Sequence, residues 1–326
     1  MNMDKLLRQL VCCPDCKSGL SEKDDALECK GCKAAFALED GIPLLFSQKI
    51  SQDPLYQSYK NQYDKDLAGQ HEHDSRHIKY MEMGLLEKLS YHVSDYRVAM
   101  HTWNSARKLS KHLSTCTRFI GPTAGLTVLD IGASEGILLS ALGGNRVAFD
   151  ISPSHLKHIR GKDILRVSGF AERLPFKNAV FDRVVSIFLF EHVLKPEELA
   201  GEITRVLRPS GKAILGVPFN EDPERLFELE EDPAKGAALE TQPRGDRKSH
   251  KPPTLHFRNF ERVEDLTRFF PELHLTKAHY YFYKRKRHFP KWFKMLLRPL
   301  RWAPDSFKKT FPSAFAPSLL QVELTR

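Results

Sequence analysis

Short apolar runs alternate with helix-compatible stretches from residue 126 onward, and this alternation constrains the fold more than any other feature. The first run is followed by a glycine-rich turn, and the second run ends at Asp150. Buried strands of a parallel sheet are continuous apolar segments of about 4–8 residues. The pattern therefore predicts an α/β fold with a doubly wound, mostly parallel sheet. Seven strands are expected, at 126–131, 146–150, 164–168, 182–188, 211–217, 275–283 and 318–325.

The overall composition is that of a globular protein. Charged residues make up 28% of the 326 residues and hydrophobic residues 41%, which excludes a disordered chain. The sequence has no run of about 18 apolar residues, so no transmembrane helix is expected. The start, Met-Asn-Met-Asp-Lys-Leu-Leu-Arg, lacks the features of a secretory signal. We therefore expect a cytoplasmic protein in a reducing compartment.

The excess of basic residues is confined to one segment. Lysine and arginine total 50 against 41 acidic residues, for a formal net charge of +9. Residues 284–326 contain 11 basic and 2 acidic residues, so the rest of the chain is neutral. A net charge influences the choice of partner where it is concentrated. An anionic partner is therefore expected to meet this segment rather than the body of the protein.

Four cysteines near the start form two C-x2-C knuckles. Cys13 and Cys16 make the first, Cys29 and Cys32 make the second, and 12 residues separate the pairs. In a reducing compartment such pairs bind a metal more often than they form disulfides. Four thiolates at this spacing suit a closed, tetrahedral structural Zn²⁺ site. The surrounding sequence resembles the small zinc-ribbon proteins that activate tRNA and protein methyltransferases. The resemblance implies a docking and stability element.

The order of these features predicts the domain organisation. Residues 1–48 are expected to form the zinc ribbon, and 49–120 a helical linker or cap. The α/β domain follows over 121–326, with insertions at 221–256 and 284–316. Apolar residues at three- and four-residue spacing support helices within 76–120.

A glycine-rich turn after the first strand allows backbone to approach a ligand closely. Gly132 and Gly136 bracket this turn, and Asp150 ends the next strand. A carboxylate at that place can accept both hydroxyls of a ribose, which indicates an adenosine-containing cofactor. The turn reads G-x-x-x-G rather than G-x-G-x-x-G, so NAD is disfavoured.

Several strings of the sequence, in order, resemble a class I S-adenosylmethionine (SAM) dependent methyltransferase of type 11. They include Val-Leu-Asp-Ile-Gly-Ala-Ser-Glu-Gly, Phe-Asp-Ile-Ser-Pro, Gly-Phe-Ala-Glu-Arg-Leu-Pro-Phe and Arg-Val-Leu-Arg-Pro-Ser-Gly, and the match runs over about 125–218. The resemblance implies a Rossmann-like fold, SAM as cofactor and methyl transfer as the reaction.

The resemblance also implies which residues hold SAM. Its methionine end, its ribose and its adenine would meet residues at the ends of successive strands: Asp130, Gly132, Ala133, Ser134 and Gly136, then Asp150 and Ile151, then Ala171 and Glu172, with Phe188 near the methyl group. Phe170 stands where the family often has an acid that contacts the adenine amino group. We therefore expect adenine to rest on an apolar face and on backbone groups.

Methyl transfer from a sulfonium is an in-line displacement that often needs a base. His192 follows the fourth strand, where acceptor and methyl meet in this family, and an imidazole can take the proton of an attacking hydroxyl. The alternative is a histidine that only packs at a helix start. Glu191 is a second candidate, although a carboxylate there could simply interact with the helix dipole. Tyrosines and histidines within 55–103 could cover the pocket, and the sequence does not select among them.

The two insertions carry further predictions. Residues 221–256 are rich in acidic residues, glycine and proline, and are expected to form a lid or a solvated loop. A short helix within 284–302 would surround one apolar side with basic residues; that side comprises Trp292, Phe293, Leu296, Leu297 and Leu300. Such a helix could contact an anionic membrane, bind nucleic acid with aromatic support, or pack on the protein.

The sequence favours an enzyme that methylates a hydroxyl on a sugar, glycolipid or secondary metabolite, with a small-molecule, glycan or lipid-linked acceptor. RNA base methylation is an alternative that suits the basic segment, but no Asn/Asp-Pro-Pro-aromatic motif follows the fourth strand, and nucleic acid is not favoured. A non-catalytic scaffold is a third alternative, which the complete set of SAM-site residues opposes.

Overall fold

The protein is described from a computed structural model. The structure describes the following residues: 3–23, 26–61, 83–84, 87–88, 109–159, 161, 163–219, 230–232, 236–238, 257–281, 284–285, 304–311 and 315–326. The predicted lid at 221–256 and the amphipathic segment at 284–302 lie almost entirely outside the described residues, as does most of the predicted linker at 49–120.

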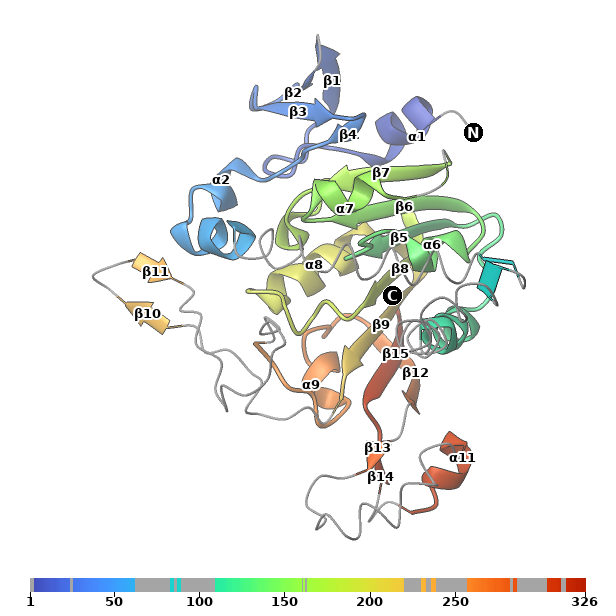
Figure 1. The fold of residues 1–326 in the computed structure, drawn as a ribbon. Coiled ribbons are helices and arrows are strands. Elements are labelled where there is room, and N and C mark those ends of the chain that lie inside the picture. Colours follow the sequence, from blue (N-terminus) through green and yellow to red (C-terminus); the bar gives the residue numbers. More distant parts are fainter. Residues whose placement is uncertain are drawn as a thin grey trace.

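A seven-stranded sheet forms the centre of the molecule (Figure 1), and the predicted fold class is confirmed. In spatial order its strands are β12 (His274–Tyr281), β15 (Leu319–Thr325), β9 (Leu207–Pro218), β8 (Phe181–Ile187), β5 (Thr127–Ile131), β6 (Asn145–Asp150) and β7 (Ile164–Ser168). Strands β9, β8, β5, β6 and β7 pair in parallel, whereas β15 runs antiparallel to both of its neighbours. The chain order reverses at β5, so the carboxyl ends of β5 and β8 border a crevice suited to a ligand.

Both faces of the sheet are covered, which explains the continuous apolar runs in the sequence. All five residues of β5 are buried. Leu129 belongs to one apolar cluster, whereas Val128 next to it belongs to another. Because successive side chains of a strand point to opposite faces, the two clusters lie on opposite sides of the sheet. The burial of both faces is typical of a parallel sheet.

Short helices connect and cover the strands. They are α1 (Met3–Leu10), α2 (Gln48–Ser51), α6 (Ile137–Ser140), α7 (Pro153–Lys157), the 3-10 turn η1 (Ala171–Arg173), α8 (Pro196–Val206), α9 (Glu264–Thr267) and α11 (Asp305–Lys308). Residues 54–61 and 109–120 are also helical. Helix α8 begins with a proline at its first turn, where the missing amide donor costs nothing. It is amphipathic and buries Leu199 and Ile203 against the sheet.

Strand β9 is longer than the sequence predicted. It begins at Leu207, directly after α8, rather than near residue 211. Its pairing with β8 shifts register between Phe181 and Arg183, which accommodates the Pro-Ser-Gly turn at 209–211. Ser210 has a φ of 61° at this turn.

The N-terminal segment forms a small antiparallel sheet that packs on the edge of the large one (Figure 1). Its strands are β1 (Leu20–Lys23), β2 (Ala26–Cys29), β3 (Ala35–Glu39) and β4 (Ile42–Pro43). Leu44 forms a parallel bridge with Ser168 of the edge strand β7, and the Leu45 amide donates to the Ser168 carbonyl at 2.7 Å. On the other side of the ribbon, Val11 bridges Phe176. The two sheets therefore share one apolar core.

Two further antiparallel strand pairs complete the described part of the chain. Strands β10 (Glu230–Asp232) and β11 (Gly236–Ala238) pair with each other, as do β13 (Lys284–Arg285) and β14 (Phe315–Ala316). Among the helices that the structure describes, none combines the length and the apolar character needed to cross a bilayer.

Candidate functional site

The four knuckle cysteines come together at one end of the ribbon. Their sulfur atoms all lie within 4.8 Å of one another. The Sγ atoms of Cys13 and Cys32 are 3.7 Å apart, and those of Cys16 and Cys29 are 3.3 Å apart. Four ligands at about 2.3 Å from a tetrahedral Zn²⁺ lie about 3.8 Å from each other. The cluster therefore has the donor set and nearly the spacing of a structural zinc site.

Local backbone conformation shapes both knuckles. Lys17 and Lys33, which follow the second cysteine of each pair, have φ values of 59° and 64°. Their amides donate to the carbonyls of Cys13 and Cys29 at 3.0 and 3.1 Å. Each knuckle thus closes as a tight turn that ends in a left-handed residue. This turn brings the two sulfurs of a pair to one side.

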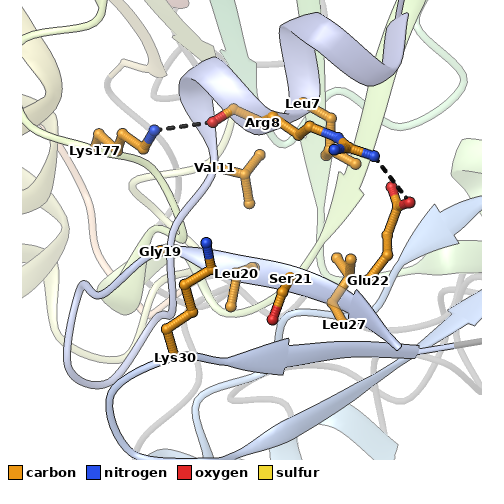
Figure 2. A pocket seen from close by; sticks show the side chains of 10 residues that line it. All are labelled: Leu7, Arg8, Val11, Gly19, Leu20, Ser21, Glu22, Leu27, Lys30 and Lys177. Atoms are coloured by element: carbon orange, nitrogen blue, oxygen red, sulfur yellow. Dashed lines mark hydrogen bonds and ion pairs between the residues drawn. The ribbon is translucent and has the colours of Figure 1, made fainter. Parts of the chain in front are cut away.

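A groove lies between α1 and the first hairpin of the ribbon (Figure 2). Apolar side chains of Leu7, Leu20 and Leu27 line it, and Arg8 closes one end through an ion pair with Glu22 at 3.0 Å. The Lys177 ammonium donates to the Arg8 carbonyl at 2.9 Å. These contacts join α1, the ribbon and the large sheet.

The turn after β5 has the backbone that a closely bound ligand requires. Gly132, Ser134 and Gly136 have φ values of 79°, 48° and 69°. The amides of Gly132 and Ala133 both donate to the Phe149 carbonyl, at 2.9 and 3.1 Å. A Cβ at Gly132 would lie 3.3 Å from Leu189, and a Cβ at Gly136 would lie 3.0 Å from Ile159. Glycine is required at both positions by conformation and by space.

The turn and the end of β6 are held together by Asp150. Its Oδ2 accepts the Ser134 amide at 2.8 Å, and its Oδ1 accepts the Ser152 amide at 2.9 Å. Burial raises the pKa of Asp150, and the two amides act against that rise. Asp130, at the end of β5, is also buried. Its pKa is raised to about 7, first by burial and then by the charge of Asp150. Two carboxyl groups thus share a site that favours a cationic ligand.

A cavity opens beside Asp150 at the carboxyl ends of β5, β6 and β8. Its lining comprises Tyr59, Ile131, Gly132, Phe149, Asp150, Ile151, Gly169, Ala171, Glu172, Leu189 and Val193. Five residues that the sequence assigned to the cofactor are among them: Gly132, Asp150, Ile151, Ala171 and Glu172. A Cβ at Gly169 would lie 2.7 Å from the Leu45 carbonyl oxygen. The glycines therefore keep backbone, rather than side chains, next to the cavity.

The other predicted cofactor residues are not part of the cavity lining. Asp130 and Ala133 are buried. Ser134 orients Asp150 through its amide, and its hydroxyl lies 3.2 Å from Nδ1 of His155. Gly136 starts α6. Phe188 is 38% exposed, and its ring centroid lies 5.9 Å from that of His112.

The expectation for Phe170 is wrong. The sequence placed its apolar face under the adenine, but the ring is 3% exposed and is absent from the cavity lining. It packs edge-on against Phe46 and Tyr56, with centroids 5.1 and 5.3 Å away. The neighbouring residues Gly169 and Ala171 line the cavity instead. The burial has a simple cause, because the segment after the ribbon covers this position.

The lining also contains residues that the sequence did not single out. Gly169, Leu189 and Val193 flank motifs that were recognised, so their proximity to the cavity could have been inferred from those motifs. Tyr59 is different, because it lies far from every motif of the sheet. The sequence offered it only as one of many tyrosines and histidines within 55–103 that could cover the pocket.

The two candidate catalytic residues follow β8. Glu191 is 1% exposed, and its Oε1 lies 4.0 Å from Nε2 of His192. Its carbonyl accepts the Phe257 amide at 2.7 Å, and the His192 amide donates to the Leu189 carbonyl at 2.8 Å. His192 is partly exposed. A buried carboxylate thus lies behind an accessible imidazole, between cavity residues Leu189 and Val193 in the chain.

Comparison with known proteins agrees with this architecture. Residues 129–215 match the model of the methyltransferase domain family. An uncharacterised methyltransferase of Mycolicibacterium vanbaalenii is 38% identical over 101 residues, which are 28% of this chain and 39% of that protein. A demethylmenaquinone methyltransferase of Clavibacter sepedonicus is 34% identical over 107 residues, which are 30% and 44% of the two chains. The chain thus spans less than half the length of these relatives.

Among solved structures, a SAM-dependent methyltransferase of Mesorhizobium loti is similar, with 18% identity and a TM-score of 0.43. The similarity covers 64% of this chain and 95% of that one. The family match includes most of β5, all of β6, β7 and β8 and most of β9, and so it contains the glycine turn, Asp150 and the Glu191–His192 pair. Residues 129–215 of this chain are therefore similar to a methyltransferase domain.

Proposed function

We propose that the protein transfers the methyl group of SAM to a hydroxyl oxygen of a sugar, a glycolipid or a secondary metabolite. The observation that carries this proposal is the 4.0 Å contact of His192 with the buried Glu191, in the turn whose residues Leu189 and Val193 line the cavity. A base adjacent to a SAM site suits an acceptor that must lose a proton, and a hydroxyl is such an acceptor.

The residues of the cavity fit the cofactor. Asp150 offers a carboxylate to ribose hydroxyls, held in place by the Ser134 and Ser152 amides. Gly132 and Gly169 line the cavity with backbone, and neighbouring protein atoms leave little space for a side chain at either position. The carboxyl groups of Asp130 and Asp150 favour a cation. When bound, SAM supplies an electrophilic methyl group on a positively charged sulfur.

His192 would take the proton of the acceptor hydroxyl at Nε2. The carboxyl group of Glu191 is buried, and its Oε1 lies 4.0 Å from that nitrogen, where it can interact with the imidazolium that forms. Glu191 acts through His192 and is a positioning residue in this scheme. Leu189 and Val193, from the same turn, present apolar surface to the cavity, which excludes water from the reacting groups.

We further propose that the ribbon binds one structural Zn²⁺ through Cys13, Cys16, Cys29 and Cys32. The four sulfurs have the donor type and the mutual distances of a tetrahedral site. Such a closed site would stabilise the fold and leave no position open for substrate.

The test is transfer of labelled methyl from SAM to a panel of acceptors. The panel includes hydroxylated sugars, glycolipids and phenols, demethylmenaquinone because relatives carry that name, and RNA. We expect labelled ether products from hydroxyl acceptors. Transfer to RNA alone, with a steep dependence on salt, would establish the alternative reaction. A wild-type protein that binds no SAM in calorimetry would be a scaffold.

The base is tested by substitution. His192→Ala should lower kcat by about 10²- to 10⁴-fold while SAM affinity stays the same. His274→Ala, at an exposed position of β12, is the matched control and should keep full activity. Full activity of His192→Ala would exclude the proposed base.

A further inference from the structure

A tyrosine from outside the methyltransferase domain lies on the wall of its cavity. Tyr59 lines the same cavity as Gly132 and Asp150, although the family match begins at residue 129. Its side chain is 6% exposed, and its ring centroid lies 6.2 Å from that of Phe257. The helical stretch 54–61, which follows the ribbon, therefore supplies part of the cavity wall.

A separate apolar cluster holds this stretch against the domain. It consists of Ile50, Tyr56, Tyr59, Phe170 and Leu194. Tyr56 is 1% exposed and packs edge-on against Phe170, and the Lys195 ammonium lies 5.6 Å from the Tyr56 ring centroid. Phe170 belongs to the segment that borders Ala171 and Glu172 of the cavity. The contact thus places Tyr59 next to the cavity by packing on residues of the site itself.

At its other end the same segment is attached to a cysteine knuckle. Asp15 lies between Cys13 and Cys16. One of its carboxylate oxygens accepts the hydroxyl of Ser47, and the other accepts the Gln48 amide at 3.0 Å. Ser47 is fully buried and caps α2, since its Oγ accepts the Ile50 amide at 3.3 Å.

These contacts form a continuous connection from the knuckle to the cavity. The Cys13–Cys16 turn holds Asp15, and Asp15 is hydrogen-bonded to the start of α2. The apolar cluster then links Ile50 of α2 to Tyr59. We propose that Tyr59 is a cofactor-contacting residue and that Asp15 is the positioning residue that sets it from the ribbon. The proposal rests on the proposed function, because it assumes that the cavity takes SAM.

This connection gives the ribbon a task beyond stability. If it is correct, order in the first knuckle contributes to the affinity for SAM at a site that the knuckle does not touch. Tyr59 adds an aromatic ring and a phenol to a cavity that Asp150 also lines, a combination that suits the adenosine portion of the cofactor.

The experiment is calorimetric titration of SAM and of S-adenosylhomocysteine into the full chain. Tyr59→Ala should weaken binding by about tenfold, and Tyr59→Phe, which keeps the ring, by less than about threefold. Asp15→Ala and Ser47→Ala should each weaken binding by about three- to tenfold. Glu39→Gln is the matched control: it removes a ribbon–domain ion pair with Lys157 (2.6 Å) that does not lead to α2, and should leave the affinity unchanged.

A double variant separates positioning from general destabilisation. If Asp15 acts through Tyr59, Asp15→Ala adds little to the loss of affinity already caused by Tyr59→Ala, whereas independent effects would add. Metal content is measured for every variant. If Asp15→Ala does not fold or retain metal, the single variants Asp15→Asn and Ser47→Ala replace it in the test.

Two failures are distinguishable. If the wild-type protein does not bind SAM, the proposed function is wrong. If the wild type binds SAM and the Tyr59 and Asp15 variants bind it equally well, only this inference is overturned. It is also overturned if Asp15→Ala and Tyr59→Ala have fully additive effects.

Discussion

Lys17, which ends the first cysteine knuckle, donates from its ammonium to the carboxylate of Glu202 in α8 across 2.9 Å. The same ammonium donates to the Leu174 carbonyl at 3.0 Å, and Arg205 donates to both carboxylate oxygens of Glu202 at 2.8 Å. The side chains of Lys17 and Glu202 are 27% and 11% exposed. The ribbon is therefore joined to the methyltransferase domain by a largely buried ionic network.

Removal of Lys17 should destabilise the whole protein. In Lys17→Met the Glu202 carboxylate keeps Arg205 but loses one buried partner, so we expect the free energy of unfolding to fall by about 1–3 kcal/mol. Urea denaturation measures it. Arg8→Met, which breaks an exposed pair with Glu22, is the control and should cost less than about 0.5 kcal/mol. Equal losses for both variants would contradict a special role for Lys17.

The raised pKa of Asp130 should make the free energy of unfolding decrease as pH rises. Its folded pKa of about 7 lies above the unfolded value, so between pH 4 and 7 the unfolded chain binds fewer protons than the folded one. The free energy of unfolding therefore falls over that range and levels off above pH 7. Asp130→Asn removes this dependence and should stabilise the protein by about 1–3 kcal/mol at pH 8, with little effect at pH 4.

Asp265 provides a control of opposite sign. Its pKa is lowered, because the amides of Glu261 and Arg262 outweigh the effect of burial. Its contribution to stability is present above the unfolded pKa and is lost as pH falls. Asp265→Asn should therefore destabilise the protein at neutral pH. A stability difference for Asp130→Asn that does not change between pH 4 and pH 8 would refute the assignment.

At Phe188 a glycine variant should be more stable than an alanine variant, the reverse of the order expected inside a helix. Its φ of 60° is unfavourable for a residue with a bulky side chain. Phe188→Gly and Phe188→Ala both lose the ring, but only alanine keeps the strained Cβ. We expect the glycine variant to be more stable by about 1 kcal/mol in thermal or urea unfolding. At Ala200, inside α8, the glycine variant should instead be less stable than alanine by a similar amount.

The zinc site can be tested by comparing a cysteine inside the cluster, Cys29, with one outside it, Cys12. Cys29→Ser should abolish stoichiometric zinc and lower the thermal midpoint, because a structural site contributes directly to folding. Cys12→Ser should keep one zinc per chain, since Cys12 lies outside the cluster of four. Elemental analysis of the purified variants distinguishes them. Loss of zinc in both would mean that Cys12 is also a ligand.

The central parallel strands could be predicted from the sequence because they are buried on both faces, as β5 is along its whole length. Val128 and Leu129 contact different apolar clusters, so the run has no polar side and reads as a strand without tertiary information. The cysteine cluster was accessible for a related reason, since each knuckle is a local turn closed by a single residue such as Lys17.

The residues that cover the cavity could not be predicted from the sequence in the same way. Phe170 was expected beneath adenine because the sequence does not reveal that Phe46 and Tyr56 occupy its face. Tyr59 lines the cavity from a segment whose start is hydrogen-bonded to Asp15 of the ribbon, a contact that the sequence pattern does not reveal. These positions depend on contacts between segments that are distant in the sequence, and no local pattern encodes them.

The position of the ribbon on β7 also bears on aggregation. An edge strand exposes unpaired amides and carbonyls that can recruit a strand from another molecule. Here Leu44 and Leu45 occupy that edge at Ser168, and the ribbon covers the apolar residues behind it. A protein that lacked the ribbon would therefore expose this edge of β7 and should be more prone to intermolecular strand pairing. By this reasoning the ribbon protects the sheet against aggregation.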